Sequence, residues 1–357
     1  MSKKIGIVTI FGLYNFGNRL QNYAVQEILK ILDYNPISLI RLEYKGKRTV
    51  KSVIKDLILC ISKKGYIKQY RSDKKKTKHF EMFQKKIKSL DIKKENLNLL
   101  KDNYDYFAIG SDQVWNPYYM LQHDSDWYFL NFCESNKKIP IAPSIGINEL
   151  PKEYHDLFKR NLLNFNNLSC REYEGAKIIS NLTGKEVETV IDPTMMLTTE
   201  QWDKVVEQPK EYDNKRYVLL YFLGQLHEEN KKLLEQLEKD GYEIINILDV
   251  NSKYYTSGPS EFVWLIKNAS LMITDSFHGC VFSILYHTPF ISFNRKGDLE
   301  MNSRINTLLK KFDFEDRMFD KDIDYEEVFN QDFSATENIL NNERNKFMNF
   351  IKKCINE

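Results

Sequence analysis

The chain is poor in cysteine, and its cysteines are not arranged for a disulfide framework or a zinc site. Five occur among 357 residues, an odd number, with no C-x-x-C pair: Cys60, Cys133, Cys170, Cys280 and Cys354. Such spacing argues against both kinds of cross-link, so we expect free thiols. The six histidines are equally scattered, and no metal is expected.

Long apolar runs are also missing. No stretch approaches the roughly 20 apolar residues that a membrane helix needs. The first four residues lead directly into an apolar segment at residues 5–10, which is too short and wrongly flanked for a signal peptide. We therefore expect a soluble, cytoplasmic protein. Only 14 glycines and 9 prolines are present, and 42% of the residues are hydrophobic, as in globular domains.

The glycine-rich motif of dinucleotide-binding folds is absent as well. Residues 15–18, Asn-Phe-Gly-Asn, follow the first predicted strand where that motif would stand, and they lack G-x-G-x-x-G. The sequence therefore favours no nicotinamide cofactor, and none of any kind is expected. A simple glycine-containing turn remains the alternative interpretation of this segment.

Charge is present, but it is unevenly distributed. Residues 41–94 carry 19 Lys and Arg against 5 acidic residues, a net of +14, which leaves −12 for the rest of the +2 chain. Two basic amphipathic helices are predicted here, over residues 50–70 and 75–89. They suit peripheral contact with the anionic inner face of a membrane, although solvated lysine faces are also common. Nucleic acid is not expected as a partner, because no binding motif accompanies the charge.

The order of elements predicts an α/β protein with two Rossmann-like, doubly wound domains facing a cleft. Strands alternate with helices through residues 1–206, a polar linker follows, and the alternation restarts over residues 216–330. A last amphipathic helix, within residues 331–357, either crosses back to the first domain or forms a dimer contact.

His278 is the most informative single residue. It follows the apolar run of residues 271–274 and precedes another apolar stretch, so it should lie at a strand-to-helix turn, where open α/β sheets bind ligands. Histidine titrates near neutral pH, and the amides at the start of a helix favour an anion. A proton donor to an anionic ligand and a simple helix cap are both consistent with this position.

A strand is predicted to begin at Tyr106 and to end at the flexible Gly110. The polar loop that follows presents Ser111, Asp112 and Gln113 together. Hydroxyl, carboxylate and amide groups suit the hydroxyls of a sugar. Three more carboxylates lie in predicted loops at strand ends, so the sequence does not identify which carboxylate acts as the general base. Each also has another possible role. Asp192 precedes a proline and also suits a turn, Glu172 suits an arginine partner, and Asp275 precedes the histidine segment.

With these motifs placed, the chain resembles the polysaccharide pyruvyl transferase family over nearly its whole length. The segments that carry the resemblance are residues 15–24 (NFGNRLQNYA), 109–115 (IGSDQVW), 170–172 (CRE), 192–194 (DPT) and 274–279 (TDSFHG).

The resemblance implies a fold similar to the two-domain GT-B glycosyltransferases and transfer of a pyruvyl unit from phosphoenolpyruvate to a sugar. The product would be a pyruvate ketal on a bacterial capsule, exopolysaccharide or other surface polysaccharide, or on its lipid-diphosphate-linked precursor, and phosphate would leave. The first domain would bind the acceptor and the second the donor. The resemblance implies that His278 is the catalytic or donor-binding histidine and that Arg171 binds an anion. Together with the chemistry of the residues, this gives the candidate catalytic residues His278, Asp112 and Asp192. The candidate donor-binding residues are Arg171, Ser276, His278, Gly279, Arg295 and Arg304. The candidate acceptor-binding residues are Asn15, Gly17, Asn18, Gln21, Ser111, Asp112, Gln113 and Trp115.

One departure from the family pattern concerns the donor. Some members carry Asp-Arg-x-His where this chain has Asp275-Ser276-Phe277-His278, so an arginine that could hold phosphate or carboxylate is missing. Arg295 and Arg304 could return to the same cleft rim, although surface salt bridges would also explain them. Two other functions stay open: a nucleotide-sugar glycosyltransferase of the same fold, and a non-catalytic saccharide-binding protein.

Overall fold

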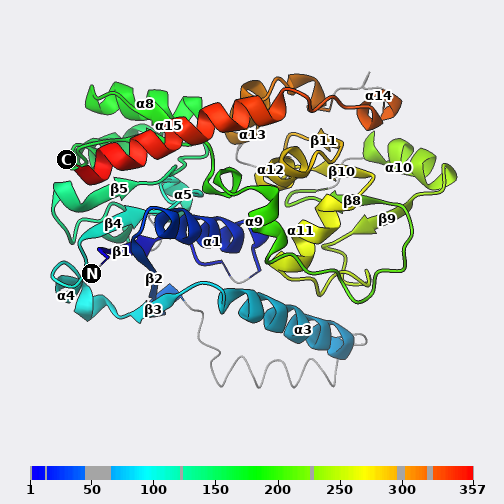
Figure 1. The fold of residues 1–357 in the computed structure, drawn as a ribbon, viewed down its shortest axis with the longest axis horizontal. Coiled ribbons are helices and arrows are strands. Elements are labelled where there is room, and N and C mark those ends of the chain that lie inside the picture. Colours follow the sequence, from blue (N-terminus) through cyan, green and yellow to red (C-terminus); the bar gives the residue numbers. More distant parts are fainter. Residues whose placement is uncertain are drawn as a thin grey trace.

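The computed structural model describes residues 2–12, 14–44, 66–120, 124–225, 229–295, 302–319 and 325–356. Two parallel β-sheets stand side by side, each covered by helices, and the chain passes from one to the other once before its last helix returns (Figure 1). The predicted α/β class with two Rossmann-like halves is confirmed.

The first half is built on a five-stranded parallel sheet of order β3-β2-β1-β4-β5. Its central strands β1 and β4 are largely buried, as in parallel sheets covered on both faces, whereas β3 at the edge is mostly exposed. The order is that of a doubly wound fold. The strands are β1 (Lys4–Val8), β2 (Asn35–Arg41), β3 (Ser89–Ile92), β4 (Tyr106–Ile109) and β5 (Lys138–Pro140).

A short two-stranded parallel sheet adjoins this one beyond β5. It consists of β6 (Ser169–Cys170) and β7 (Glu188–Thr189), and the Arg171 N–H donates to the Pro143 carbonyl at 3.0 Å. The helices of this half are α1 (Phe16–Ile31), α3 (Tyr66–Gln84), α4 (Leu97–Leu100), α5 (Pro117–Met120), α6 (Ser125–Tyr128), α7 (His155–Leu162), α8 (Tyr173–Thr183) and α9 (Thr199–Asp203).

The second half repeats the pattern with a four-stranded parallel sheet of order β11-β10-β8-β9. The strands are β8 (Tyr217–Tyr221), β9 (Glu243–Asn246), β10 (Leu271–Thr274) and β11 (Phe290–Ser292), and the helices are α10 (Glu229–Lys239), α11 (Pro259–Lys267), α12 (Phe277–Tyr286), α13 (Ser303–Lys311) and α14 (Tyr325–Phe329). The predicted linker, residues 207–215, lies between α9 and β8.

The last helix, α15 (Thr336–Asn356), runs back over the first half, as one of the two sequence-based alternatives predicts (Figure 1). Its Arg344 Nε donates to the Met195 carbonyl at 2.9 Å, and its Ile355 carbonyl accepts from the Tyr106 hydroxyl at 2.8 Å. Phe347 and Ile351 are fully buried. The apolar face of this helix therefore completes the core of the first half.

The basic segment differs from its prediction. Of the second predicted helix, residues 75–84 belong to α3, which begins at Tyr66 and ends at Gln84, and Ser89 already belongs to β3. Most of the first predicted helix lies outside the described residues. α3 packs beneath α11 of the other half, where the His79 ring lies 2.9 Å from the Glu261 carboxylate.

Candidate active site

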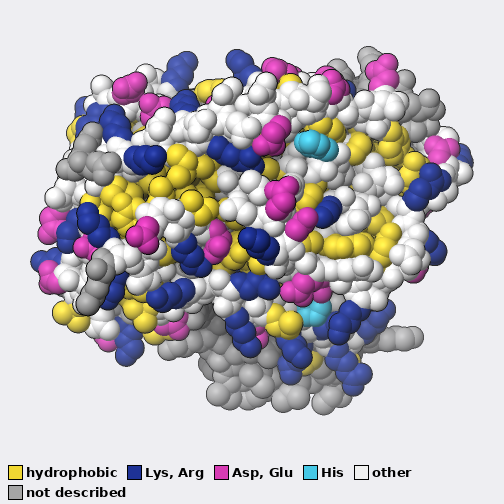
Figure 2. Space-filling view, in the orientation of Figure 1, with side chains coloured by type: hydrophobic (Ala, Val, Ile, Leu, Met, Phe, Trp, Pro, Cys, Tyr) yellow, Lys and Arg dark blue, Asp and Glu magenta, His cyan; other side chains and the backbone are white. Residues whose placement is uncertain are grey.

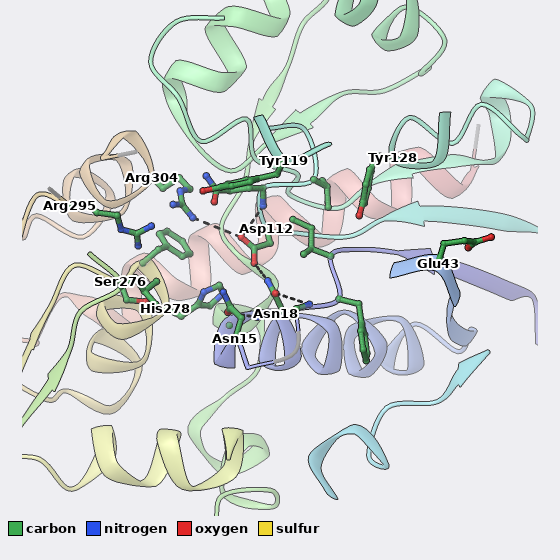
Figure 3. Close-up of a pocket in the computed structure, with 18 residues that line it drawn as sticks. Asn15, Asn18, Glu43, Asp112, Tyr119, Tyr128, Ser276, His278, Arg295 and Arg304 are labelled. Atoms are coloured by element: carbon green, nitrogen blue, oxygen red, sulfur yellow. Dashed lines mark hydrogen bonds and ion pairs between the residues drawn. The ribbon is translucent and has the colours of Figure 1, made fainter. Parts of the chain in front are cut away.

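A cavity of about 580 Å³ opens between the two halves, at the carboxyl ends of both parallel sheets, where α/β folds bind ligands (Figure 3). Both halves contribute to its wall. The lining residues are Ile10, Phe11, Gly12, Asn15, Gly17, Asn18, Glu43, Asp112, Gln113, Val114, Tyr119 and Tyr128 from the first half, and Leu223, Ser276, Phe277, His278, Arg295 and Arg304 from the second.

His278 lies at the strand-to-helix turn that the sequence predicts. β10 ends at Thr274, Ser276 caps α12 by accepting from the Gly279 N–H at 3.4 Å, and His278 is the second residue of the helix. Its ring reaches the other half and lies against Gly17 so closely that a Cβ there would overlap the imidazole. The absence of a side chain at Gly17 is therefore what lets the histidine approach α1.

Two helix N-termini face each other at this point. Asn15 caps α1 by accepting from the Asn18 N–H at 3.1 Å, opposite the start of α12 (Figure 3). Helix N-termini carry a partial positive charge and unpaired amides, so each favours an anion. The middle of the cavity is thus suited to a negatively charged ligand.

Asp112 lies on the cavity wall opposite Arg304. Its φ of +77° is unusual for a residue with a side chain, which marks a position held by its surroundings. Asn18 donates an amide hydrogen bond to one carboxylate oxygen, and the other accepts from the Gln113 N–H at 2.9 Å. Burial alone would raise the pKa of Asp112, but Arg171, His278 and Arg304 outweigh it and lower the pKa, so this carboxylate is ionised.

Asp192 and Arg171 form a buried ion pair behind the wall. Arg171 Nη1 lies 2.6 Å from Asp192 Oδ2, which also accepts from the Ser111 hydroxyl at 2.7 Å. His278 Nε2 lies 3.8 Å from the other Asp192 oxygen. Neither Arg171 nor Asp192 lines the cavity. Their expected roles in donor binding and catalysis stay predictions, and in the free protein both side chains are buried behind the wall.

The charge state of His278 also departs from expectation. Burial is the largest influence and lowers its pKa. Asp192 and Asp112 raise the pKa, Arg171 and Arg304 lower it, and the net shift is downward. The imidazole is therefore neutral at pH 7 without a ligand. A neutral ring can accept a proton, whereas the expected donor form requires a bound anion or prior proton transfer.

Arg295 and Arg304 both reach the cavity wall, beside Ser276 (Figure 3). Arg295 Nη2 donates to the Asp275 carbonyl at 3.2 Å, and its Nε lies 3.4 Å from the Asp275 carboxylate. Arg304, on α13, is 7% exposed, and its Nη1 lies 3.9 Å from Asp112. Burial and the neighbouring Arg171 lower the pKa of Arg304 to about 10. Neither Arg295 nor Arg304 therefore forms the surface salt bridge that was the alternative interpretation.

Several expected site residues are packed behind the wall. Trp115 is fully buried and donates its indole N–H to the Tyr128 carbonyl at 3.1 Å, so it cannot stack on a sugar. Gln21 donates to the Thr9 hydroxyl at 2.7 Å, and Gly279 packs against Thr274. Ser111 is fully buried against the Arg171–Asp192 pair. The expected acceptor-side residues that do line the cavity are Asn15, Gly17, Asn18, Asp112 and Gln113.

Glu172 accepts hydrogen bonds from backbone groups behind the cavity wall, although its charge also acts on Arg171. One of its oxygens accepts from the Ile145 and Gly146 N–H groups at 2.8 and 2.9 Å, and the side chain is fully buried. It anchors the loop after β5. No cluster of three or more His, Cys, Asp or Glu side chains among the described residues is arranged to hold a metal ion.

Sequence reasoning missed the aromatic part of the wall and one carboxylate. Phe11, Tyr119 and Tyr128 line the cavity, as does Glu43 just beyond β2. Phe11 and Glu43 follow the ends of strands, so the argument applied to Asp112 and His278 would have found them. Tyr119 and Tyr128 belong to four-residue helices that leave no periodic signal.

Two parallel α/β halves with a ligand-sized cavity between the carboxyl ends of their strands define the GT-B class of fold. Solved structures similar to this chain are a putative UDP-N-acetylglucosamine 2-epimerase from Listeria monocytogenes (10% identity, TM-score 0.46, 99% of this chain and 96% of that one) and a glycosyltransferase from Rickettsia africae (12%, 0.45, 98% and 95%). No match was found among curated proteins.

Within that class, the sequence profile described as polysaccharide pyruvyl transferase matches residues 15–297, most of the chain. The chain belongs to the polysaccharide pyruvyl transferase family, which confirms the resemblance drawn from its motifs. Membership implies a transferase with a saccharide acceptor.

Proposed function

We propose that this protein transfers the pyruvyl unit of phosphoenolpyruvate to two hydroxyls of one sugar, forming a ketal and releasing phosphate. The observation that carries the proposal is the cavity wall on which Arg295, Arg304, His278 and the start of α12 face Asn18 and Asp112. Family membership supplies the reaction class.

The donor side suits an anion with two acidic groups. Phosphoenolpyruvate carries a carboxylate and a phosphate, and the planar fork of arginine binds both with paired hydrogen bonds. Arg295 and Arg304 lie on the same stretch of wall as Ser276. They would together supply the cation that the Asp-Arg-x-His pattern supplies elsewhere.

The reaction needs proton transfer at two steps. In the first step, the oxygen of one sugar hydroxyl loses its proton and bonds to the enol carbon, while the methylene carbon gains a proton. The number of protons is therefore unchanged by this step. A second hydroxyl oxygen then bonds to the same carbon, the carbon–oxygen bond to phosphate breaks, and this second proton leaves with phosphate or a base. Neutral His278 and ionised Asp112, both on the wall, are the groups placed to accept these protons. Asp192 acts as a positioning residue for His278.

The acceptor would bind the first half, where Asn15, Asn18 and Gln113 present amide groups to the cavity. A sugar of a surface polysaccharide, or of a lipid-linked precursor, supplies the neighbouring hydroxyls that a ketal requires.

Calorimetric titration with phosphoenolpyruvate, beside a panel of nucleotide sugars, tests the donor. We expect phosphoenolpyruvate to bind and Arg304→Met to weaken it by about tenfold or more, because a charge-assisted hydrogen bond is lost. Arg160→Met, at an exposed position on α7, is the matched control and should bind normally. Saturable binding of a nucleotide sugar with no response to phosphoenolpyruvate would identify a glycosyltransferase instead.

A phosphate-release assay with the acceptor tests the chemistry. His278→Asn should lower the rate by about 10²–10⁴-fold while donor affinity stays within about threefold, since a positioned acid or base contributes this much. A variant that keeps its rate would remove His278 from the mechanism.

Peripheral membrane contact through residues 41–94 belongs to the same proposal, with a cytoplasmic location. Lys and Arg side chains gather on the surface over α3, and Ile67 and Met82 are exposed among them (Figure 2). None of the helices in the described part of the chain has the length and apolar character to cross a membrane. Sedimentation with anionic vesicles, but not with neutral ones, is expected, and Lys74→Glu with Lys78→Glu should abolish it. Equal sedimentation of both proteins would exclude this surface.

A further inference from the structure

One buried arginine beside the cavity has no carboxylate partner among the residues that the structure describes. Arg19, the fourth residue of α1, is 4% exposed, and its guanidinium carbon lies 3.7 Å from the centre of the Phe11 ring. Its Nε and Nη1 atoms are buried and make no hydrogen bond. Among the described residues, no carboxylate lies within ion-pair distance of it.

The other buried arginines in the described part of the chain are all paired. Arg41 Nε lies 3.0 Å from Glu43, Arg171 Nη1 lies 2.6 Å from Asp192, and Arg304 Nη1 lies 3.9 Å from Asp112. Burial of a charge without a counter-charge is costly, so buried charges are normally paired or bind ions. Burial alone also lowers the pKa of Arg19, to about 10. A charge kept at this cost points to an anion that binds there.

The position of Arg19 indicates where that anion would come from. Phe11, on which the guanidinium stacks, is part of the cavity wall, and so is Asn18, the preceding residue. Arg19 therefore lies directly behind the wall of the first half. Figure 3 shows that Arg295 and Arg304 lie at the opposite end of the cavity from Glu43 and Tyr128, with Asn18 between. In the proposed function, the anionic groups of the donor would bind at the Arg295 end.

We propose that Arg19 is a second anion site of the cavity, which binds a phosphate or diphosphate carried by the acceptor when the Phe11 side chain rotates aside. Calling this ligand the acceptor rests on the proposed function. The guanidinium fork suits phosphate oxygens, and the stacked ring holds it in place meanwhile. The same chemistry is found in a sugar phosphate and in a lipid diphosphate.

Titration with inorganic pyrophosphate tests this site. Arg304→Met serves as the reference protein, because the donor end is then weakened. We expect it to bind pyrophosphate, and the double variant Arg19→Met/Arg304→Met to bind at least about tenfold more weakly. Arg19→Met alone should leave phosphoenolpyruvate affinity within about twofold. Unchanged pyrophosphate binding in the double variant would overturn the proposal, and so would loss of phosphoenolpyruvate binding in Arg19→Met.

Thermal unfolding separates ligand binding from a structural role. Methionine is shorter than arginine and lacks the stacked guanidinium, but it leaves an unbranched apolar side chain in the same place. Arg19→Met should therefore unfold at the same or a higher temperature without ligand, since an unpaired buried charge is removed. A lower midpoint, restored by Arg19→Lys, would make Arg19 a structural residue and overturn the proposal. If no protein in the set binds phosphoenolpyruvate, the proposed donor is wrong, but the pyrophosphate comparison still decides the role of Arg19.

The two sources of phosphate are distinguished by titrating the wild-type protein with glucose 1-phosphate and with geranyl diphosphate. Tighter binding of the lipid diphosphate, lost in Arg19→Met, identifies a lipid-linked acceptor. Tighter binding of the sugar phosphate, also lost in Arg19→Met, identifies a soluble one. If Arg19→Met weakens neither, no acceptor phosphate binds at this residue.

Discussion

Gly17 and His278 are in contact across the boundary between the two halves. The place of the imidazole ring depends on both residues. The imidazole occupies the space that a side chain at Gly17 would need. On the other side of the ring, Nε2 lies 3.8 Å from Asp192 and makes no hydrogen bond. The reactive position of His278 thus depends on a residue 261 positions earlier in the sequence.

Gly17→Ala should therefore separate activity from stability. Alanine favours a helix over glycine by about 1 kcal/mol, and this gain offsets the displacement of the ring. We expect a thermal midpoint close to wild type and phosphate release reduced by about 10²-fold or more, because proton transfer depends on position. The two assays on one preparation check this. Full activity would mean that the ring does not need its present place.

The lowered pKa of His278 predicts how donor binding depends on pH. The ring is neutral in the free protein, and a bound anion raises its pKa, so binding takes up a proton and tightens as the pH falls from about 8 to 6. Calorimetry in buffers of different ionisation enthalpy measures that uptake. In His278→Asn, the only remaining proton uptake on donor binding should come from the phosphate group of the donor. Identical proton uptake in the two proteins would contradict the assignment.

At the scale of elements, the loops after β4, β6 and β7 are joined by one buried network, in which Ser111, Arg171 and Asp192 each come from a different loop. Arg171→Met leaves Asp192 buried without its cation, so we expect a loss of about 3–5 kcal/mol in the free energy of unfolding by urea. Lys267→Met, which breaks an exposed pair with Asp203, is the control and should cost less than about 1 kcal/mol. Equal costs would contradict the buried character of the network.

The same pair sets the response to acid. Burial would raise the pKa of Asp192, but Arg171 and His278 hold it below its usual range. A lowered pKa in the folded state stabilises the protein fully above the unfolded value, near 3.8, and this contribution is lost as the pH falls toward the folded value. Arg171→Met should therefore unfold at a higher pH than the wild type in an acid titration followed by fluorescence.

The sequence predicts those elements whose pattern is local. The apolar run at residues 271–274 is β10, and residues 5–10 correspond to β1 with its end at Val8. β3 was missed because its four residues, Ser89–Ile92, are mostly exposed and become a strand only by pairing with β2. The apolar spacing predicts the first helix from about Arg19 to Leu32, but α1 begins three residues earlier, at Phe16, since Asn15 acts as its cap.

The candidate site was predictable to the extent that it follows strand ends. That argument places His278, Asn18 and Asp112 at one cavity, and the structure brings them together. The position of a residue after a strand does not show whether its side chain points into the cavity or into the core. Trp115 and Arg171 follow strands too, yet their side chains turn into the core, because distant partners fix them there.

At the scale of the whole molecule, two helices tie the halves together. α3 of the first half packs on α11 of the second, and α15 returns from the second to the first. A single apolar cluster contains Ile7 of β1, Leu219 of β8 and Phe347 of α15. The two sheets should therefore unfold as one cooperative unit.

Phe347→Ala tests this coupling. Truncation of a fully buried phenylalanine costs about 3–5 kcal/mol, and we expect calorimetry to show one transition at a lower temperature. Lys352→Ala, at an exposed position of the same helix, should change stability by less than about 0.5 kcal/mol. Two separate transitions would show that the halves unfold independently.

The returning helix also has a consequence for the order in which the chain is made. Residues 336–356 are synthesised after both sheets, yet Phe347 and Ile351 fill the core of the sheet that is synthesised first. A ribosome adds about 5–20 residues per second, so the first half waits some ten seconds or more with an uncovered apolar surface. Nascent chains stopped before Thr336 should consequently recruit chaperones that the finished protein does not need.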